Sequence, residues 1–412
     1  IAAGAGLAAL LAGGYMVEHK LERGELYPLM LFAAFGAMVL ARAVDLLTLF
    51  VGLETMSLGV YALVAFRRSS PRAAEAAIKY FLLGSFAAAL LLLGSAYLYG
   101  ATGHTDFAGI AEVIRGGQAD SRLLLLALML VVAGFAFKVS AVPFHMWTPD
   151  AYEGATTPVT TFMAVCVKTS VFVVMARVFL ISFAGSDLAS SASGWPPIVA
   201  GLAALTMLVG NLAAIGQTSV KRMLAYSSIA HAGYILVGLV AASKIGAPAV
   251  SAVLYYLAAY TVSNVLAFSA LVFAGSRGRE VVSYEDLAGL GRRSPMLALP
   301  FVLGVLSLMG FPPTAGFFAK YYVFMSAVEA GGGMVWLAVF GAFTSAIGAF
   351  YYLRVLVYLF MREPAEDAAV AVPMRSAYVL TAMVVAAVFV LQMGVAPGGY
   401  IKLVSAAASL FA

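Results

Sequence analysis

Long apolar runs recur along almost the whole chain, and they limit its fold more than any other feature. A run of about 20 apolar residues is long enough to cross a bilayer as an α-helix. The sequence predicts twelve spans separated by short polar connections, with no soluble domain. The expected spans are residues 1–17, 26–41, 44–66, 73–99, 122–147, 156–182, 196–216, 222–243, 247–274, 297–328, 333–361 and 373–394. The predicted fold class is therefore an all-α polytopic membrane protein.

The composition agrees with this fold and excludes several chemistries. Hydrophobic residues make up 63% of the 412 residues and charged residues 10%, and the mean hydropathy is +0.99. The single cysteine, Cys166, rules out a disulfide framework and a cysteine-ligated iron–sulfur cluster within this chain. The four histidines lack metal-ligand spacing, and no glycine-rich nucleotide motif is present. No cofactor, metal or nucleic acid is therefore expected to bind this chain.

The basic residues in the connections are distributed unequally between alternate sides. One side has only Arg115, Arg122 and Lys244. The other side has thirteen: Lys20, Arg23, Arg67, Arg68, Arg72, Lys221, Arg222, Arg277, Arg279, Arg292, Arg293, Arg362 and Arg375. Because Lys and Arg concentrate in cytoplasmic loops, the thirteen predict the cytoplasmic face of a bacterial inner membrane.

Five charged residues lie inside apolar runs: Glu54, Lys79, Lys138, Lys168 and Lys320. A charge at the bilayer centre costs about 2.5–3.5 kcal/mol, so all five are expected to face the bundle interior. One carboxylate cannot neutralise four ammonium groups. Static ion pairs remain an alternative, but the excess of lysines favours groups that bind and release protons.

Structural interpretations are open for other polar and aromatic side chains in the spans. Lys79 is one turn from a helix end, where snorkelling explains it equally well. His231 is a possible relay group or a hydrogen-bonded structural histidine. The adjacent Tyr351 and Tyr352 fit an interfacial anchor.

Two lysines lie beside helix breakers. Pro143 follows Lys138, and Gly310, Pro312, Pro313 and Gly316 precede Lys320. Proline inside a span removes a backbone donor, so both helices are expected to be interrupted. The interrupted spans are the fifth and tenth of the twelve, which suggests two inverted five-helix repeats. The predicted division is a leading helix (1–25), a first repeat (26–182), a second repeat (183–361), and a last helix with its tail (362–412).

Three stretches together carry a family resemblance. They are VPFHMWTPDAYEGATTPVTTFMAVCVKTSVF, VKRMLAYSSIAHAGYILVG and GFPPTAGFFAKYYVF. The chain resembles the antiporter-like membrane subunits of respiratory complex I, the proton-pumping NADH:quinone oxidoreductase. The WTPD stretch and the lysine of the second broken helix are most similar to subunit N. The resemblance implies a fourteen-helix fold, and the missing leading Met fits the loss of two helices before the twelve seen here.

The resemblance also implies roles for individual residues. Glu54 matches a glutamate that pairs electrostatically with Lys138, Lys168 matches a central connecting lysine, and Lys320 matches the lysine of the exit half-channel. Lys79 matches a further lysine of the family. The implied function is proton translocation coupled to quinone reduction elsewhere. FMN, iron–sulfur clusters and quinone are then expected in the other membrane and peripheral subunits, which include neighbouring antiporter-like subunits.

Two other functions remain open from the sequence. A subunit of a multisubunit sodium/proton antiporter or of a membrane-bound hydrogenase would keep the same lysines. A quinone-reducing subunit is disfavoured because the chain lacks cofactor ligands.

Overall fold

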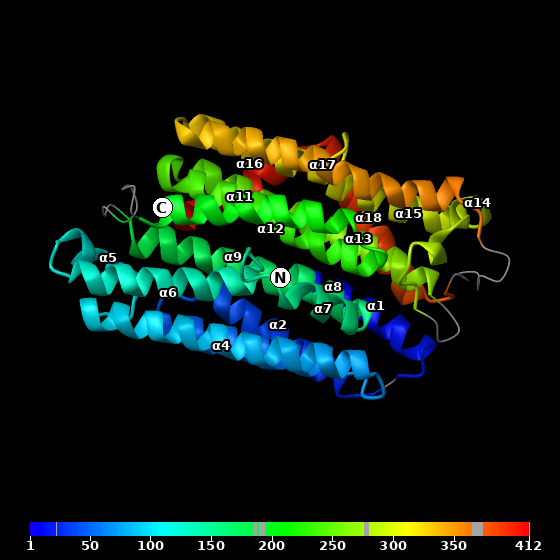
Figure 1. Ribbon diagram of the computed structural model, residues 1–412, viewed down its shortest axis with the longest axis horizontal. Coiled ribbons are helices and arrows are strands. Elements are labelled where there is room, and N and C mark those ends of the chain that lie inside the picture. The colour runs from blue at the N-terminus through cyan, green and yellow to red at the C-terminus, as the bar shows by residue number, and fades with distance from the viewer. Residues whose placement is uncertain (22, 185–187, 189–193, 276–279, 365–373, 412) are drawn as a thin grey trace.

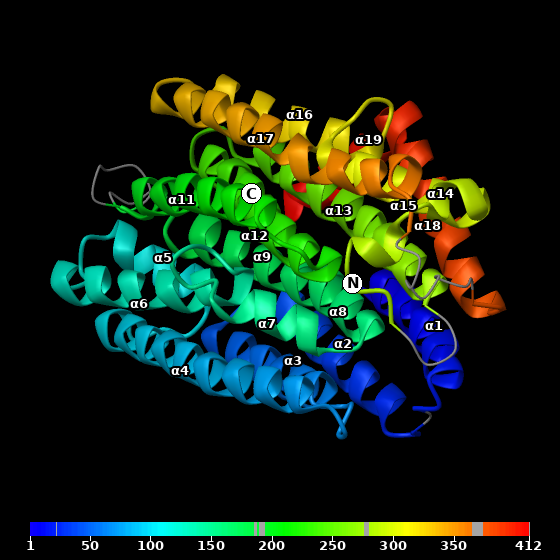
Figure 2. The same ribbon diagram turned by 45° about the vertical axis from the view of Figure 1, so that its right-hand side comes forward.

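The chain folds as an elongated bundle of helices that lie side by side along its long axis (Figure 1). The computed structural model describes residues 1–21, 23–184, 188, 194–275, 280–364 and 374–411. The helix Pro71–Thr102 runs along one edge and the helix Gly333–Met361 along the other, with helices from the middle of the chain between them (Figures 1 and 2). The first helix, Ala2–Glu18, packs against Ala377–Val395 near the end of the chain. In the described residues, β-structure is limited to two isolated bridges, Asp45–Asp106 and Ser219–Ser283.

The first half of the chain ends with a long helix that contains two π-helical turns. Thr157–Ser182 is one continuous span of 26 residues. In order, the elements are α1 (Ala2–Glu18), α2 (Leu26–Arg42), α3 (Leu46–Val64), α4 (Pro71–Thr102), α5 (Phe107–Arg115), α6 (Ser121–Val139), α7 (Trp147–Gly154), α8 (Thr157–Phe162), η1 (Met163–Val167), α9 (Lys168–Arg177) and η2 (Val178–Ser182).

The second half contains the longest central helices. In order, the elements are α11 (Trp195–Ile215), α12 (Val220–Ile245), α13 (Ala247–Ala274), η3 (Glu285–Leu287), α14 (Leu290–Arg293), α15 (Pro295–Met309), α16 (Ala315–Ala330), α17 (Gly333–Met361), α18 (Ala377–Val395), α19 (Pro397–Ala408) and η4 (Ser409–Phe411). The central helix α12 is almost entirely buried: 94% of its most apolar 18-residue stretch lies inside the bundle.

The all-helical membrane fold expected from the apolar runs is confirmed. Nine helices of the described residues are long and apolar enough to cross a membrane. Helices α1 and α2 are apolar but shorter, with 17 residues each. The expected span 297–328 is two helices, α15 and α16, separated by a break.

Small residues let neighbouring helices approach closely in both halves of the chain. A Cβ atom added at Gly52 of α3 would lie 2.6 Å from the backbone nitrogen of Leu40 in α2. A Cβ atom at Gly210 of α11 would lie 2.6 Å from the backbone nitrogen of Ala230 in α12. The pairs α2–α3 and α11–α12 therefore pack backbone against backbone, as small residues allow in membrane helices.

Both predicted helix breaks are present. Helix α6 ends at Val139, and Ser140 adopts a left-handed conformation with φ of 66°. Helix α15 ends at Met309, and Gly310 has φ of 88°. Side chains satisfy the freed backbone groups at the first break, since Trp147 Nε1 donates to the carbonyl oxygen of Phe137 at 2.9 Å. The interrupted helices are therefore stabilised by contacts within the bundle.

Candidate functional site

Three of the predicted lysines are buried inside the bundle. The exposed fraction is 1% for Lys138, 1% for Lys168 and 8% for Lys320. They come from α6, α9 and α16 and so belong to three different helices. The expectation that these lysines face inward is confirmed.

Lys138 lies at the end of α6 and reaches hydroxyl groups of α3. Its Nζ donates to Ser57 Oγ at 2.8 Å and to the Tyr61 hydroxyl at 3.3 Å. Ser57 in turn donates to the carbonyl oxygen of Leu53 at 2.6 Å. The buried ammonium group is therefore held by neutral oxygens.

Glu54 lies on the same face of α3, one turn before Ser57, because residues three apart share a helix face. In the described structure no direct ion pair joins its carboxylate to Lys138, although the charge of Glu54 reaches that lysine. Its Oε1 is buried without a hydrogen-bond partner. Glu54 and Lys138 thus interact with each other electrostatically, while the lysine donates its hydrogen bond to the Ser57 hydroxyl. In the described structure their side chains do not form the direct ion pair that an electrostatic pairing would suggest.

Lys168 follows the π-helical turn η1 and points at α12. Its Nζ donates to the carbonyl oxygen of Ser228 at 2.6 Å and to Ser228 Oγ at 2.5 Å. The Tyr260 hydroxyl donates to the same Oγ at 2.7 Å, and the Tyr152 hydroxyl lies 3.3 Å from it. One serine therefore joins Lys168 to two buried tyrosines from α13 and α7.

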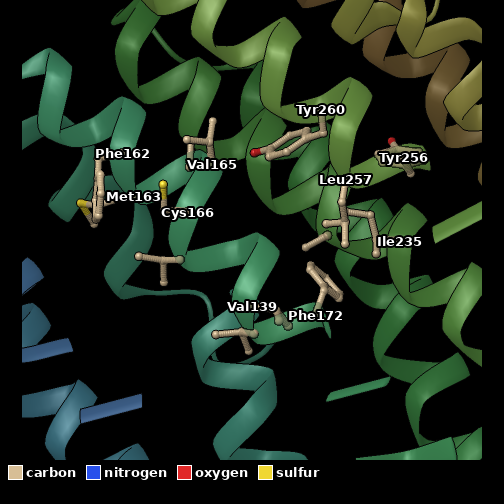
Figure 3. Packing of buried hydrophobic residues seen from close by; sticks show 14 of the residues in the cluster. Val139, Phe162, Met163, Val165, Cys166, Phe172, Ile235, Tyr256, Leu257 and Tyr260 are labelled. Carbon is tan, nitrogen blue, oxygen red and sulfur yellow. The ribbon is translucent and has the colours of Figure 1, made fainter. Parts of the chain in front are cut away.

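Buried apolar side chains pack around the span that carries Lys168 (Figure 3). Val165, Cys166 and Phe172 of its own helix pack among side chains from α6, α12 and α13, which include Ile235 and Leu257. Lys168 itself is 1% exposed, so it makes the polar contacts described above inside the bundle.

His231 lies one turn after Ser228 on α12 and is 4% exposed. Its Nδ1 is 2.7 Å from the Tyr256 hydroxyl, and its Nε2 is 3.2 Å from the Tyr352 hydroxyl, which also hydrogen-bonds Ser227. The charges of both Lys168 and Lys320 reach the imidazole. His231 is therefore within electrostatic reach of both lysines.

The expected interfacial tyrosine anchor is wrong. Tyr351 and Tyr352 are 1% and 2% exposed. The Tyr351 hydroxyl donates to Asn211 Oδ1 at 2.9 Å, while Tyr352 bonds Ser227 and His231. Both hydroxyl groups hydrogen-bond to protein groups inside the bundle, so both tyrosines can be buried away from the membrane–water interface.

Lys320 is held by the second helix break. Its Nζ donates to the carbonyl oxygen of Met309 at 2.8 Å and to Ser345 Oγ of α17 at 2.7 Å. Met309 is the last residue of α15, so the break leaves its carbonyl without a helical partner. The ammonium group also lies 5.1 Å from the centre of the Tyr234 ring.

Lys79 does not face the interior, and its predicted place among the buried lysines is wrong. Its side chain is 46% exposed and pairs with Glu75 at 2.6 Å and with Asp150 at 3.0 Å. Asp150 also binds Arg222 at 2.7 Å. The acidic end of α7 lies beside this part of α4, so Lys79 is neutralised at the surface.

Sequence reasoning missed a buried ion pair at the start of α12. Lys221 was expected in a loop, but its side chain is 1% exposed and its Nζ lies 3.0 Å from Glu280 Oε1. The two residues are 59 positions apart. No local sequence pattern indicates this contact, because Lys221 and Glu280 lie in separate parts of the chain and neither stands inside an apolar run.

Comparison with known proteins identifies the family. Residues 43–348 match the family described as NADH:quinone oxidoreductase/Mrp antiporter, TM. NADH-quinone oxidoreductase subunit N 1 of Sorangium cellulosum is 61% identical over 398 residues, which cover 96% of this chain and 78% of that protein. The chain belongs to the subunit N family of NADH-quinone oxidoreductases. Subunit N of Trichlorobacter lovleyi is 45% identical and covers 88% of this chain and 73% of its own length.

Solved structures share the fold of the subunit N family. A chain of respiratory complex I from Thermus thermophilus with bound aureothin is 38% identical, covers 96% of this chain and 86% of its own, and gives a TM-score of 0.78. A chain of the Mrp complex from a Dietzia species is 22% identical, covers 98% of this chain and 82% of its own, and gives a TM-score of 0.84. The fold alone therefore does not separate the two classes, whereas sequence identity places the chain with subunit N.

Proposed function

We propose that the chain is a proton-translocating membrane-arm subunit of NADH:quinone oxidoreductase that carries no redox cofactor itself. Quinone reduction, FMN and iron–sulfur clusters then belong to partner subunits. The observation that carries the proposal is the set of buried lysines Lys138, Lys168 and Lys320, each bonded to hydroxyl or carbonyl oxygens in the described structure. An ammonium group without a fixed carboxylate partner can lose its proton more readily than one in an ion pair.

The groups between Lys168 and Lys320 suit proton transfer. Ser228 binds Lys168, and the next contacts on α12 and α17 are those of Ser227, Tyr352 and His231. Hydroxyl and imidazole groups both donate and accept hydrogen bonds, so they can pass a proton on. In this proposal His231 relays a proton between the connecting lysine Lys168 and the exit lysine Lys320.

Glu54 controls the first lysine in this mechanism. A negative charge near Lys138 favours the ammonium form, and a change in their separation releases the proton toward Lys168. Two ammonium groups in a poorly screened interior repel each other, so protonation at Lys138 also drives the proton on Lys168 toward Lys320. Lys79 has no part in this path because its charge is neutralised at the surface.

We further propose the inverted five-helix repeats at residues 26–182 and 183–361 within a fourteen-helix fold. Helix α2 packs on α3 as α11 packs on α12, and α4 packs on α6 as α13 packs on α15. Each half contains one broken helix with a lysine beside the break. The face rich in Lys and Arg is proposed to be cytoplasmic. Of the thirteen residues behind this prediction, Lys221 is buried, and Arg277 and Arg279 lie outside the described residues.

A sodium/proton antiporter subunit is the second candidate. The similarity of the fold to an Mrp complex chain favours it, but that chain is only 22% identical. Proton translocation that does not depend on sodium would separate the first candidate from the second.

The test is a Lys168→Ala variant in the complete complex. We expect the complex to assemble, while proton pumping into inverted membrane vesicles and quinone reductase turnover both fall. Lys402→Ala is the control, since Lys402 is an exposed lysine of α19. Parental pumping by Lys168→Ala would contradict the proposed function.

A further inference from the structure

A short segment ties the second broken helix to α12. Residues 280–287, here called the strap, lead from the region after α13 into α14 and α15. The backbone nitrogen of Val220 donates to the carbonyl oxygen of Val282 at 2.8 Å. Ser219 and Ser283 form an isolated antiparallel bridge. The approach to α15 is thereby anchored at the start of α12.

Glu280, the first residue of the strap, also binds the start of α8, which follows the first broken helix. Its Oε1 accepts hydrogen bonds from the backbone nitrogen of Thr157, at 3.1 Å, and from the Thr157 hydroxyl. Thr157 opens α8, directly after the link that follows α7. Lys221 Nζ donates to the same carboxylate oxygen and to the carbonyl oxygen of Ala155 at 2.6 Å. The Glu280 carboxylate therefore joins the strap to the start of α8 and to Lys221 of α12, and Lys221 in turn binds the α7–α8 link.

This contact is charged and shielded from solvent. The exposed fractions of the side chains are 1% for Lys221 and 15% for Glu280. Burial alone would raise the pKa of Glu280, but the Lys221 ammonium group and the hydrogen bonds from Thr157 and Lys221 hold it below its ordinary value. Glu280 is thus a fixed anion at neutral pH, and removal of either partner would leave an uncompensated buried charge.

We infer that Glu280 and Lys221 are positioning residues that transmit movement between the two broken helices, a role that rests on the proposed proton translocation. Helix α7 carries Tyr152, whose hydroxyl lies 3.3 Å from the serine that binds Lys168. Helix α15 ends at Met309, whose carbonyl oxygen holds Lys320. A displacement of α7 moves the α7–α8 link, which pulls the strap through Glu280.

The last three residues of the strap form η3, and the displacement continues from there through α14 to α15. These elements follow one another directly in the chain, and α14 packs against both α15 and α17. Coupling over such distances is carried by rigid elements and hydrogen-bonded contacts of this kind. The ion pair therefore connects the surroundings of Lys168 to those of Lys320 by a route separate from the hydroxyl and imidazole groups.

The first experiment compares two acidic residues of the strap in the complete complex. Glu280→Ala removes the carboxylate that binds Thr157 and Lys221, whereas Glu285→Ala removes an exposed carboxylate five residues before α14 begins. We expect Glu280→Ala to retain quinone reductase turnover but to pump several-fold fewer protons per electron. Glu285→Ala should match the parent. If Glu280→Ala fails to assemble, Glu280→Gln, which keeps an acceptor for Thr157, is measured in the same way.

A disulfide then separates positioning from a role of the carboxylate as a proton carrier. Ser219→Cys and Ser283→Cys are added to Glu280→Ala in a Cys166→Ala background. Bridged antiparallel residues have Cα atoms about 4.5–5.5 Å apart, which suits a disulfide. Oxidation makes the backbone contact between the strap and α12 covalent, and Lys221 still binds the α7–α8 link, so pumping should rise on oxidation and fall again on reduction. The single Ser219→Cys variant receives the same treatments as a control.

The outcomes distinguish the inference from the proposed function. Parental pumping by Glu280→Ala, or a loss that oxidation does not reverse, would overturn the positioning role. Lys168→Ala is measured alongside, and it should lose pumping whether thiols are oxidised or reduced. If Lys168→Ala pumps normally, the proposed function fails and the inference fails with it; if only Glu280→Ala pumps normally, the inference alone fails.

Discussion

Lys138→Arg separates a proton carrier from a fixed positive charge. Arginine keeps the charge and the ability to donate to Ser57 and Tyr61, which are the partners of the lysine. It cannot release its proton, because a guanidinium group has a pKa above about 12. Release at pH 7 would then cost about 7 kcal/mol, from roughly five pH units at about 1.4 kcal/mol each. A step that needs this release would be slowed by about 10⁵-fold, so we expect pumping to be lost.

The larger side chain has a second effect that the assay must separate. Lys138 is 1% exposed, so the extra volume of arginine has little room and is expected to cost about 1–3 kcal/mol in packing. Complex content is therefore measured on native gels, and pumping in inverted vesicles is expressed per electron and per assembled complex. Lys79→Arg is the control, because Lys79 is exposed and ion-paired. A Lys138→Arg complex with the parental proton-to-electron ratio would refute the carrier role and make Lys138 a structural cation.

Three further predictions follow from the contacts of the other residues. Glu54→Gln should assemble but lower both pumping and quinone reductase turnover, since it removes the charge that acts on Lys138; unchanged activity would make the carboxylate structural. Tyr352→Phe should slow pumping by several-fold, because it removes the hydroxyl between Ser227 and His231; pumping at the parental rate would exclude this tyrosine from the path. A cysteine in place of Ser70, in a Cys166→Ala background, should resist an impermeant thiol reagent added outside intact cells, and labelling there would reverse the proposed orientation.

The buried lysines and the helix breaks could be predicted from the sequence because each is visible within one apolar run. A lysine such as Lys168 stands out among hydrophobic neighbours, and the glycines and prolines before Lys320 mark the interruption. Burial then followed from the cost of charge in a membrane. The same reasoning placed Lys79 inside the bundle, which was wrong because Asp150 is brought beside it by a helix that begins 68 residues later.

The partners of the lysines could not be predicted because they come from distant parts of the chain. Ser57 is 81 residues from Lys138, and the residues of the Ser227–Tyr352 contact are 125 apart. Serine and tyrosine are common in membrane helices, and their sequence surroundings do not show which lysine or histidine they will meet. A buried tyrosine with a satisfied hydroxyl has the same local pattern as one at the interface, which explains the mistaken anchor.

The two broken helices control their lysines in different ways. Lys138 lies before its break and is held by side chains of another helix, so movement of α3 relative to α6 changes its contacts and its distance from Glu54 together. Lys320 lies after its break and is held by the carbonyl oxygen of Met309, which the break itself exposes. A change in the break therefore acts on Lys320 directly. Under the proposed function, the first lysine responds to a neighbouring charge and the last responds to the geometry of its own helix, so proton entry and proton exit have separate controls.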